Sequence, residues 1–154
     1  QFLLRPALRN ILGQTNTEFS LTDLLYSRKI LLVPLNKGVI GAHSAQLLGS
    51  LIVGHLWPLI LKRAEIPPEK RHILAIYIDE LQDYMGLPTS LNDALAKSRG
   101  LGAGWTLAHQ FRNQLSAELK SGIDANCKNK INFFFFYNFY SFVHSFYCWV
   151  YFNT

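Results

Sequence analysis

Three short runs of mainly apolar residues constrain the fold of this chain more than any other feature. They lie within residues 29–35, 73–78 and 105–108. Continuous rather than alternating apolar residues are typical of strands that are buried on both faces. Segments of helical length separate the runs, and this alternation indicates a parallel, doubly wound sheet with helices packed against it. We therefore predict an α/β fold with strands in these three places.

Helical patterns account for much of the remaining chain. We predict helices over residues 2–12, 20–26, 43–63 and 90–99. Ser20 is a good N-cap for the second helix, since its hydroxyl can accept a hydrogen bond from a free backbone N–H. The third helix is apolar on all sides and contains Pro58, so we expect it to be buried and kinked. Its length also suits a membrane span, but His43 and His55 favour a core helix.

The composition excludes some classes of protein and leaves others open. Hydrophobic residues make up 49% of the 154 residues and charged residues 16%, which excludes a disordered or fibrous chain. The net charge of +5 permits contact with nucleic acid, but the basic residues form no dense run. Cys127 and Cys148 lack the spacing of a zinc site, so we expect both to be free thiols.

Both ends of the chain are unusual. It starts at Gln1 without a signal-peptide pattern and contains only one methionine, Met85, so we expect it to be cut from a longer protein. Thirteen of the 24 residues from Ile131 onward are aromatic, with neither strand nor helix periodicity. We therefore divide the chain into an α/β domain, or part of one, over residues 1–131 and an anomalous tail of non-native or frame-shifted origin over residues 132–154. A membrane-associated tail is the alternative, which its asparagines disfavour.

Polar residues follow two of the predicted strands. Asp79 and Glu80 end the 73–78 run, and Gln110 follows the 105–108 run. The carboxyl ends of parallel strands form the ligand-binding edge of such a sheet. There one carboxylate can hold Mg²⁺, a neighbouring carboxylate can polarise the attacking water, and an amide can orient that water beside a phosphate. The alternative is that these are ordinary solvated side chains at strand ends.

Arg99 lies at the end of the helix that is predicted between these two strands. A cation there complements the negative end of the helix, which stabilises it by about 0.3–1 kcal/mol. The alternative is that Arg99 reaches into the site of a neighbouring subunit, where an arginine stabilises transition-state charge. Lys97 is a competitor for the same role. The glycines at positions 100, 102 and 104 precede a strand rather than a helix, which excludes a dinucleotide-binding fingerprint.

Three stretches together resemble a known family. Residues 29–38 (KILLVPLNKG), 76–82 (IYIDELQ) and 94–115 (ALAKSRGLGAGWTLAHQFRNQL) are similar to the TraG/TraD-type coupling ATPases of conjugation and type IV secretion, within the wider FtsK and HerA group. The resemblance covers residues 8–131. It implies part of a RecA-like P-loop motor domain that forms a homo-hexamer and uses ATP and Mg²⁺ to pump single- or double-stranded DNA. It also implies relaxosome or type IV secretion components as partners, and a cytoplasmic location at the inner face of the bacterial membrane.

The resemblance further implies roles for individual residues. Asp79 would be the Walker B ligand of Mg²⁺, Glu80 the catalytic base, and Gln110 the sensor glutamine beside the nucleotide. Arg99 would act in the site of a neighbouring subunit. The family's Walker A loop and its membrane anchor are missing from these 154 residues, so we expect both upstream and expect this fragment alone not to hydrolyse ATP.

Two other functions are compatible with the sequence. The first is a non-catalytic RecA-like binding module that docks a relaxosome or secretion partner, which the missing phosphate-binding loop would favour. The second is a degenerate fragment without a function, which the two unusual ends would favour.

Overall fold

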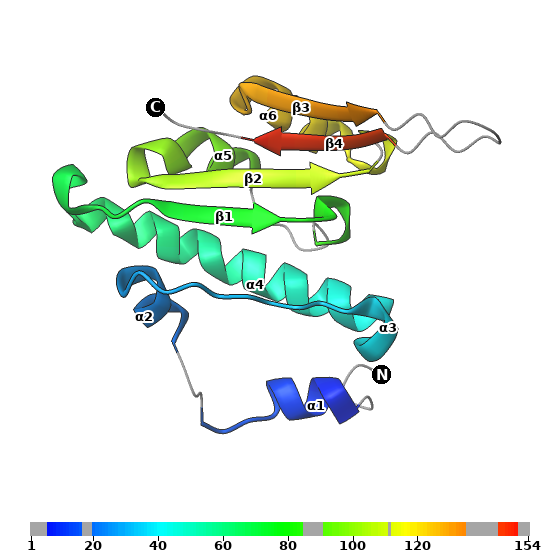
Figure 1. The fold of residues 1–154 in the computed structure, drawn as a ribbon. Coiled ribbons are helices and arrows are strands. Elements are labelled where there is room, and N and C mark those ends of the chain that lie inside the picture. Colours follow the sequence, from blue (N-terminus) through cyan, green and yellow to red (C-terminus); the bar gives the residue numbers. More distant parts are fainter. Residues whose placement is uncertain (1–5, 17–19, 85–90, 111, 135–144, 151–154) are drawn as a thin grey trace.

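Short helices begin the chain and a sheet ends it (Figure 1). The computed structural model describes residues 6–16, 20–84, 91–110, 112–134 and 145–150. The helices are α1 (Pro6–Leu12), α2 (Leu21–Tyr26), α3 (Lys37–Ile40), α4 (Ala42–Lys62), α5 (Leu91–Lys97) and α6 (Ala117–Asn126). The strands are β1 (Leu74–Ile78), β2 (Ala103–His109), β3 (Asn129–Phe134) and β4 (Ser145–Val150). Two of the 3₁₀ turns also matter below, η4 (Leu81–Asp83) and η5 (Ser98–Leu101). The predicted α/β class is confirmed.

The helices begin where the sequence supplies a capping side chain. Ser20 accepts a hydrogen bond from the backbone N–H of Thr22 at 3.2 Å and so caps α2, as predicted. Ser116 caps α6 in the same way through the N–H of Leu119, also at 3.2 Å. The sequence interpretation had not included α6. Residues 2–5 of the predicted 2–12 helix lie outside the described residues, and α1 accounts for the remainder.

Four strands form one sheet in the order β1-β2-β4-β3. β1 and β2 run parallel, in register from Leu74 opposite Ala103 to Ile78 opposite Leu107. α5 lies in the connection between them, because parallel neighbours need a crossover. β4 runs antiparallel to both β2 and β3. The sheet is therefore mixed, and the predicted parallel pairing holds for β1 and β2 only.

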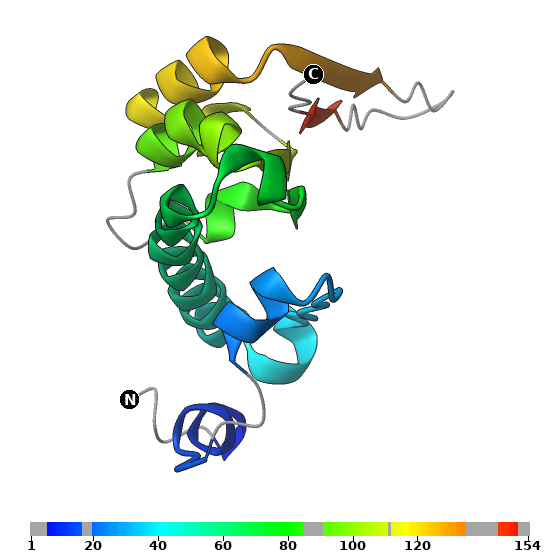
Figure 2. The same cartoon turned by 90° about the vertical axis from the view of Figure 1, so that its left-hand side faces the viewer.

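The core lies on one face of the β1–β2 pair. Ile76, Trp105 and Leu107 point to this face and are at most 8% exposed. Side chains from α4, α5 and α6 complete the same core, and Figure 2 shows α5 and α6 together on one side of the sheet. On the other face Tyr77 is 73% exposed. The prediction that residues 73–78 are buried on both faces is therefore wrong, since alternate side chains of β1 point to a face that no described helix covers.

Residues 29–35 do not form the predicted buried strand. They are extended but make no backbone ladder within the described part of the chain. Ile30 and Leu32 are 87% and 83% exposed. The segment runs past α4 between α2 and α3 (Figure 1). Arg28 and Lys37, which lie on either side of it in the sequence, contact His72 and Glu80 around β1. The apolar pattern was a signal of strand propensity, but burial also requires a neighbouring strand and a covering layer.

The long helix α4 is buried on one face rather than on all sides. Its buried apolar residues, Ala45, Leu48, Val53, Trp57 and Ile60, recur at helical spacing. His43 and His55 are exposed. The stretch Ala42–Glu65 is long and apolar enough to cross a membrane, by length and composition only, and 44% of its most apolar window is buried inside the fold. The buried stripe favours the core helix over the membrane span.

The aromatic tail contributes β4 and part of β3 to the sheet. β3 begins at Asn129, and β4 pairs with β2 from Thr106 opposite Val150 to His109 opposite Tyr147. Residues 135–144 and 151–154 lie outside the described residues. The division of the chain at residue 131 and the origin of the tail stay predictions.

Candidate functional site

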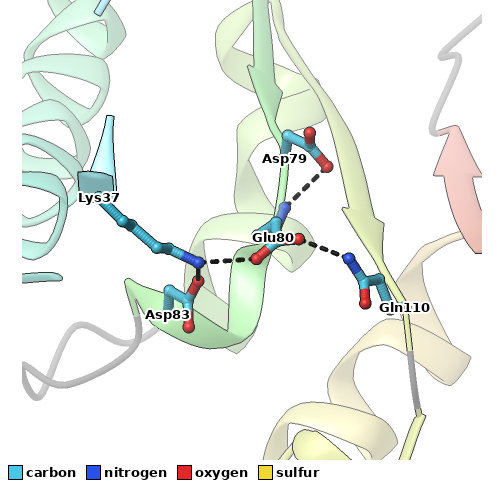
Figure 3. Close-up of polar contacts among 5 residues, drawn as sticks. All are labelled: Lys37, Asp79, Glu80, Asp83 and Gln110. Atoms are coloured by element: carbon cyan, nitrogen blue, oxygen red, sulfur yellow. Dashed lines mark hydrogen bonds and ion pairs between the residues drawn. The ribbon is translucent and has the colours of Figure 1, made fainter. Parts of the chain in front are cut away.

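β1 and β2 end side by side at one rim of the sheet, and the polar residues that follow them meet there. Ile78, the last residue of β1, lies opposite Leu107 of β2, so Glu80 and Gln110 follow their strands at similar heights. Gln110 Nε2 donates a hydrogen bond to Glu80 Oε1 at 2.6 Å (Figure 3). The structure thus brings together two of the residues that the sequence singled out, although 30 positions separate them along the chain.

A left-handed turn follows β1 and separates the two neighbouring carboxylates. Glu80 has φ 52° and ψ 47°, a conformation that costs a non-glycine residue about 1–2 kcal/mol. Asp79 Oδ1 accepts a hydrogen bond from the Glu80 N–H at 2.9 Å, and the turn η4 starts directly afterwards. In Figure 3 the Asp79 side chain lies on the strand side of the turn, and the Glu80 side chain points to Gln110. Strained residues of this kind are concentrated at functional sites.

Lys37 joins Asp79, Glu80 and Gln110 in a polar cluster at the rim. The sequence interpretation missed this residue. Its Nζ donates to Glu80 Oε2 at 2.8 Å and to Asp83 Oδ2 (Figure 3). It is the first residue of α3, and the Asn36 side chain caps this helix by accepting from Gly38 N–H at 2.9 Å. Lys37 and Glu80 are 43 residues apart in the sequence, so no local sequence pattern could predict their contact. Asp83 could have been found, because a residue three positions after Glu80 returns to the same side of a helical turn.

The cluster is formally negative, since it holds three carboxylates, of Asp79, Glu80 and Asp83, and one ammonium group, which contacts Glu80 and Asp83. The hydrogen bonds that Lys37 donates to Asp83 and then to Glu80 raise the pKa of Lys37 well above its usual value, so it stays charged at neutral pH. Glu80 and Asp83 are partly exposed, with 32% and 18% of their side-chain surfaces accessible. The rim therefore offers a carboxylate-rich edge that a cation with open coordination positions would favour.

Helix α4 holds the turn that carries Glu80 and Asp83. Ser50 Oγ donates to the carbonyl oxygen of Tyr84 at 2.9 Å. Gly49, one residue earlier, leaves room for the Tyr84 ring, because a Cβ at this position would lie 2.2 Å from Tyr84 Cδ1. Leu81 is fully buried in the core beneath the turn. The acidic rim is thus built on packed elements, which is a requirement for a precise site.

The residues at the rim could supply one protein ligand to the Mg²⁺ of a magnesium–nucleotide complex. They do not form a complete metal site. Among the described residues, no group of three or more His, Cys, Asp or Glu could hold a metal ion. Mg²⁺ bound to a nucleotide needs only one or two carboxylates, because phosphate oxygens and waters supply its other ligands. Asp79 is exposed at the end of β1 and fits this role. The 154 residues contain no GxxxxGK[ST] loop to hold the phosphates.

Arg99 lies away from the rim. It belongs to η5, which precedes β2, and the N–H of Leu74 at the start of β1 donates to Gly102 O directly after η5. Arg99 is therefore at the amino ends of β1 and β2, whereas Glu80 and Gln110 lie at their carboxyl ends. The structure does not bring Arg99 to the site of its own chain. Its competitor Lys97 forms an ion pair with Asp93 one turn earlier on α5.

Comparisons with protein-family profiles, with curated protein sequences and with solved structures found no match to this chain. The fold and the rim define a mixed α/β protein with an acidic cluster at the carboxyl end of a parallel strand pair. The resemblance to coupling ATPases, the RecA-like topology and the roles of Asp79, Glu80, Gln110 and Arg99 stay predictions.

Proposed function

We propose that this chain supplies the metal-binding and water-activating half of a RecA-like motor ATPase that uses ATP to pump DNA. One observation carries the proposal: Glu80 and Gln110, at the ends of two parallel neighbouring strands, are joined by a hydrogen bond of 2.6 Å. In parallel sheets this rim is where ligands bind. The carboxylate pair Asp79–Glu80 beside an amide matches the chemistry that phosphate hydrolysis requires.

Each residue at the rim has a distinct chemical task in this proposal. Asp79 would hold Mg²⁺, directly or through water, and the bound Mg²⁺–ATP would supply the electrophilic phosphorus. Glu80 would accept the proton of the attacking water. Gln110 holds Glu80 through its NH₂ group, and its carbonyl oxygen is an acceptor that can orient the same water. A shift of this amide would report whether the γ-phosphate is present.

The remaining parts of the motor lie outside the residues described. The resemblance places the phosphate-binding loop upstream, where its backbone N–H groups and lysine would hold the β- and γ-phosphates. It also implies a hexamer that binds DNA at the inner face of a bacterial membrane, with relaxosome or secretion components as partners. In such a ring Arg99, at the opposite end of the strands from Glu80, would meet the site of the next subunit.

The test is DNA-stimulated ATP hydrolysis by the chain joined to the segment that precedes it in its gene. Glu80→Gln removes the base and keeps the size of the side chain, so we expect turnover to fall by about 10²-fold or more. Glu69→Gln, which changes an exposed glutamate in the 3₁₀ turn Pro68–Lys70, is the matched control and leaves turnover unchanged. Equal turnover in Glu80→Gln and the wild type contradicts the assignment. Absence of hydrolysis in the wild type favours the non-catalytic binding module.

The role of Arg99 requires an experiment on mixed subunits. Inactive Arg99→Ala subunits are added in increasing proportion to active ones. If Arg99 acts in the neighbouring site, activity falls more steeply than the fraction of active subunits, because each variant subunit also disables its neighbour. A fall in proportion to dilution excludes the trans role.

A further inference from the structure

A lysine from outside the predicted site holds the Glu80 carboxylate in place. We propose that Lys37 is a positioning residue: it fixes the Glu80 side chain so that Oε1 faces Gln110. The proposal rests on the proposed function for one point only, that Glu80 is the base.

The contacts divide the Glu80 carboxylate between two donors. Gln110 Nε2 holds Oε1 at 2.6 Å, and Lys37 Nζ holds Oε2 at 2.8 Å. A glutamate at a partly exposed rim otherwise samples several rotamers, because its side chain has three rotatable bonds. Two donors that approach different oxygens leave one orientation of the carboxylate plane. Figure 3 shows Glu80 between its two partners, which come from different elements.

Asp83 completes the arrangement by holding Lys37 itself. The ammonium group binds both Glu80, which precedes the turn η4, and Asp83, which ends it. A lysine at the start of a helix gains nothing from the helix dipole, so local preference does not explain its position. The two carboxylates do explain it. They also raise the pKa of Lys37, in agreement with a permanent cation at this point.

A contribution to global stability does not account for this contact. The Lys37 side chain is 40% exposed, and ion pairs at this level of exposure stabilise folded proteins very little. Replacement of Lys37 should therefore leave the chain folded. Its effect should appear in the geometry of Glu80 and Gln110, and a purely structural role would leave that geometry unchanged.

The first test uses the side-chain amide of Gln110 in the intact 154-residue chain. In Lys37→Met we expect the Gln110 Nε2 hydrogens to exchange with solvent about three- to tenfold faster in NMR measurements, since loss of a fixed acceptor weakens their hydrogen bond. Lys37→Arg keeps the cation and restores most of the protection. Lys70→Met removes an exposed cation elsewhere and is the control. Equal exchange in Lys37→Met and the wild type overturns the proposal.

The second test separates this proposal from the proposed function. In the ATP-hydrolysing protein, Lys37→Met should lower kcat with little change in KM, because Lys37 acts on the base and not on nucleotide binding. If Glu80→Gln abolishes hydrolysis and Lys37→Met does not lower kcat, the positioning role is wrong and the proposed function stands. If Glu80→Gln has no effect, the proposed function fails, and the Gln110 exchange rates alone decide whether Lys37 positions Glu80.

Discussion

Glu80 adopts a left-handed backbone conformation, which is energetically unfavourable for residues with a side chain and which glycine adopts readily. Its left-handed φ of 52° is retained although glutamate has a Cβ, and its side chain is the one that joins Lys37 to Gln110. The cost of this conformation, about 1–2 kcal/mol, is offset by the surrounding fold. A residue that is unfavourable for stability at its position and central to a polar cluster is the pattern expected when function determines its identity.

This interpretation predicts opposite effects for two glycine substitutions in the same turn. Glu80→Gly relieves the left-handed strain, so the free energy of unfolding should stay constant or rise by up to about 1 kcal/mol. Gln82 lies within η4 and is not among the residues with a positive φ. Gln82→Gly should therefore lower the free energy of unfolding by about 0.5–1 kcal/mol. Denaturant unfolding measures both. A large loss of stability in Glu80→Gly would show that the glutamate side chain itself holds the turn.

The ion pairs of Lys37 predict how the free energy of unfolding depends on pH. Its pKa in the folded chain is raised above the usual 10.5, first by Asp83 and then by Glu80. A raised pKa means that the ion pairs stabilise the fold below pH 10.5 and lose this effect as the pH rises further. The difference in unfolding free energy between the wild type and Lys37→Met should therefore be small and constant at neutral pH and vanish only in strong alkali. A difference that disappears near neutral pH would contradict these contacts.

At the scale of elements, the sequence predicted what depends on local signals. α2, β1, β2 and α5 were found because their caps, apolar runs and breaks are local. The rim was found for the same reason, since Asp79, Glu80 and Gln110 directly follow strands. Residues 29–35 were assigned wrongly because strand pairing depends on distant neighbours, which no apolar run specifies.

The long helix α4 gives a prediction at this scale. In the middle of a helix, alanine normally stabilises relative to glycine by about 0.5–1 kcal/mol. In Gly49→Ala the new methyl group would meet the Tyr84 ring and, at 2.9 Å, Leu35 Cδ1, so we expect a net destabilisation of about 1–2 kcal/mol. Gly100→Ala is the control, because no heavy atom lies within 4 Å of its Cβ position. A gain in stability for Gly49→Ala would show that Tyr84 does not pack on α4.

At the scale of the whole molecule, a core on one side of the sheet supports a rim at its end. α4, α5 and α6 cover one face of β1 and β2, while Tyr77 and Ile73 remain exposed at 73% and 90%. Lys37 reaches the rim from the start of α3, two residues after the segment that the sequence had placed in a buried strand. Such a contact between distant parts of the chain could not be predicted, because it depends on how α3 and α4 pack beside β1. Local sequence patterns thus predicted the carboxylates and the amide at the rim. Only the folded structure revealed that Lys37 lies beside them.

Paramagnetic broadening by Mn²⁺–ATP shows whether Asp79, Glu80 and Gln110 together face a metal-bound triphosphate, as we propose. The measurement is made by NMR on the protein that includes the upstream segment, with Mn²⁺ in place of Mg²⁺. We predict that the amide signals of these three residues broaden most, and that Arg99 broadens only in the assembled ring, where it would meet the nucleotide of the neighbouring subunit. Broadening centred on another part of the molecule, or uniform weak broadening, would show that the nucleotide does not bind at this rim.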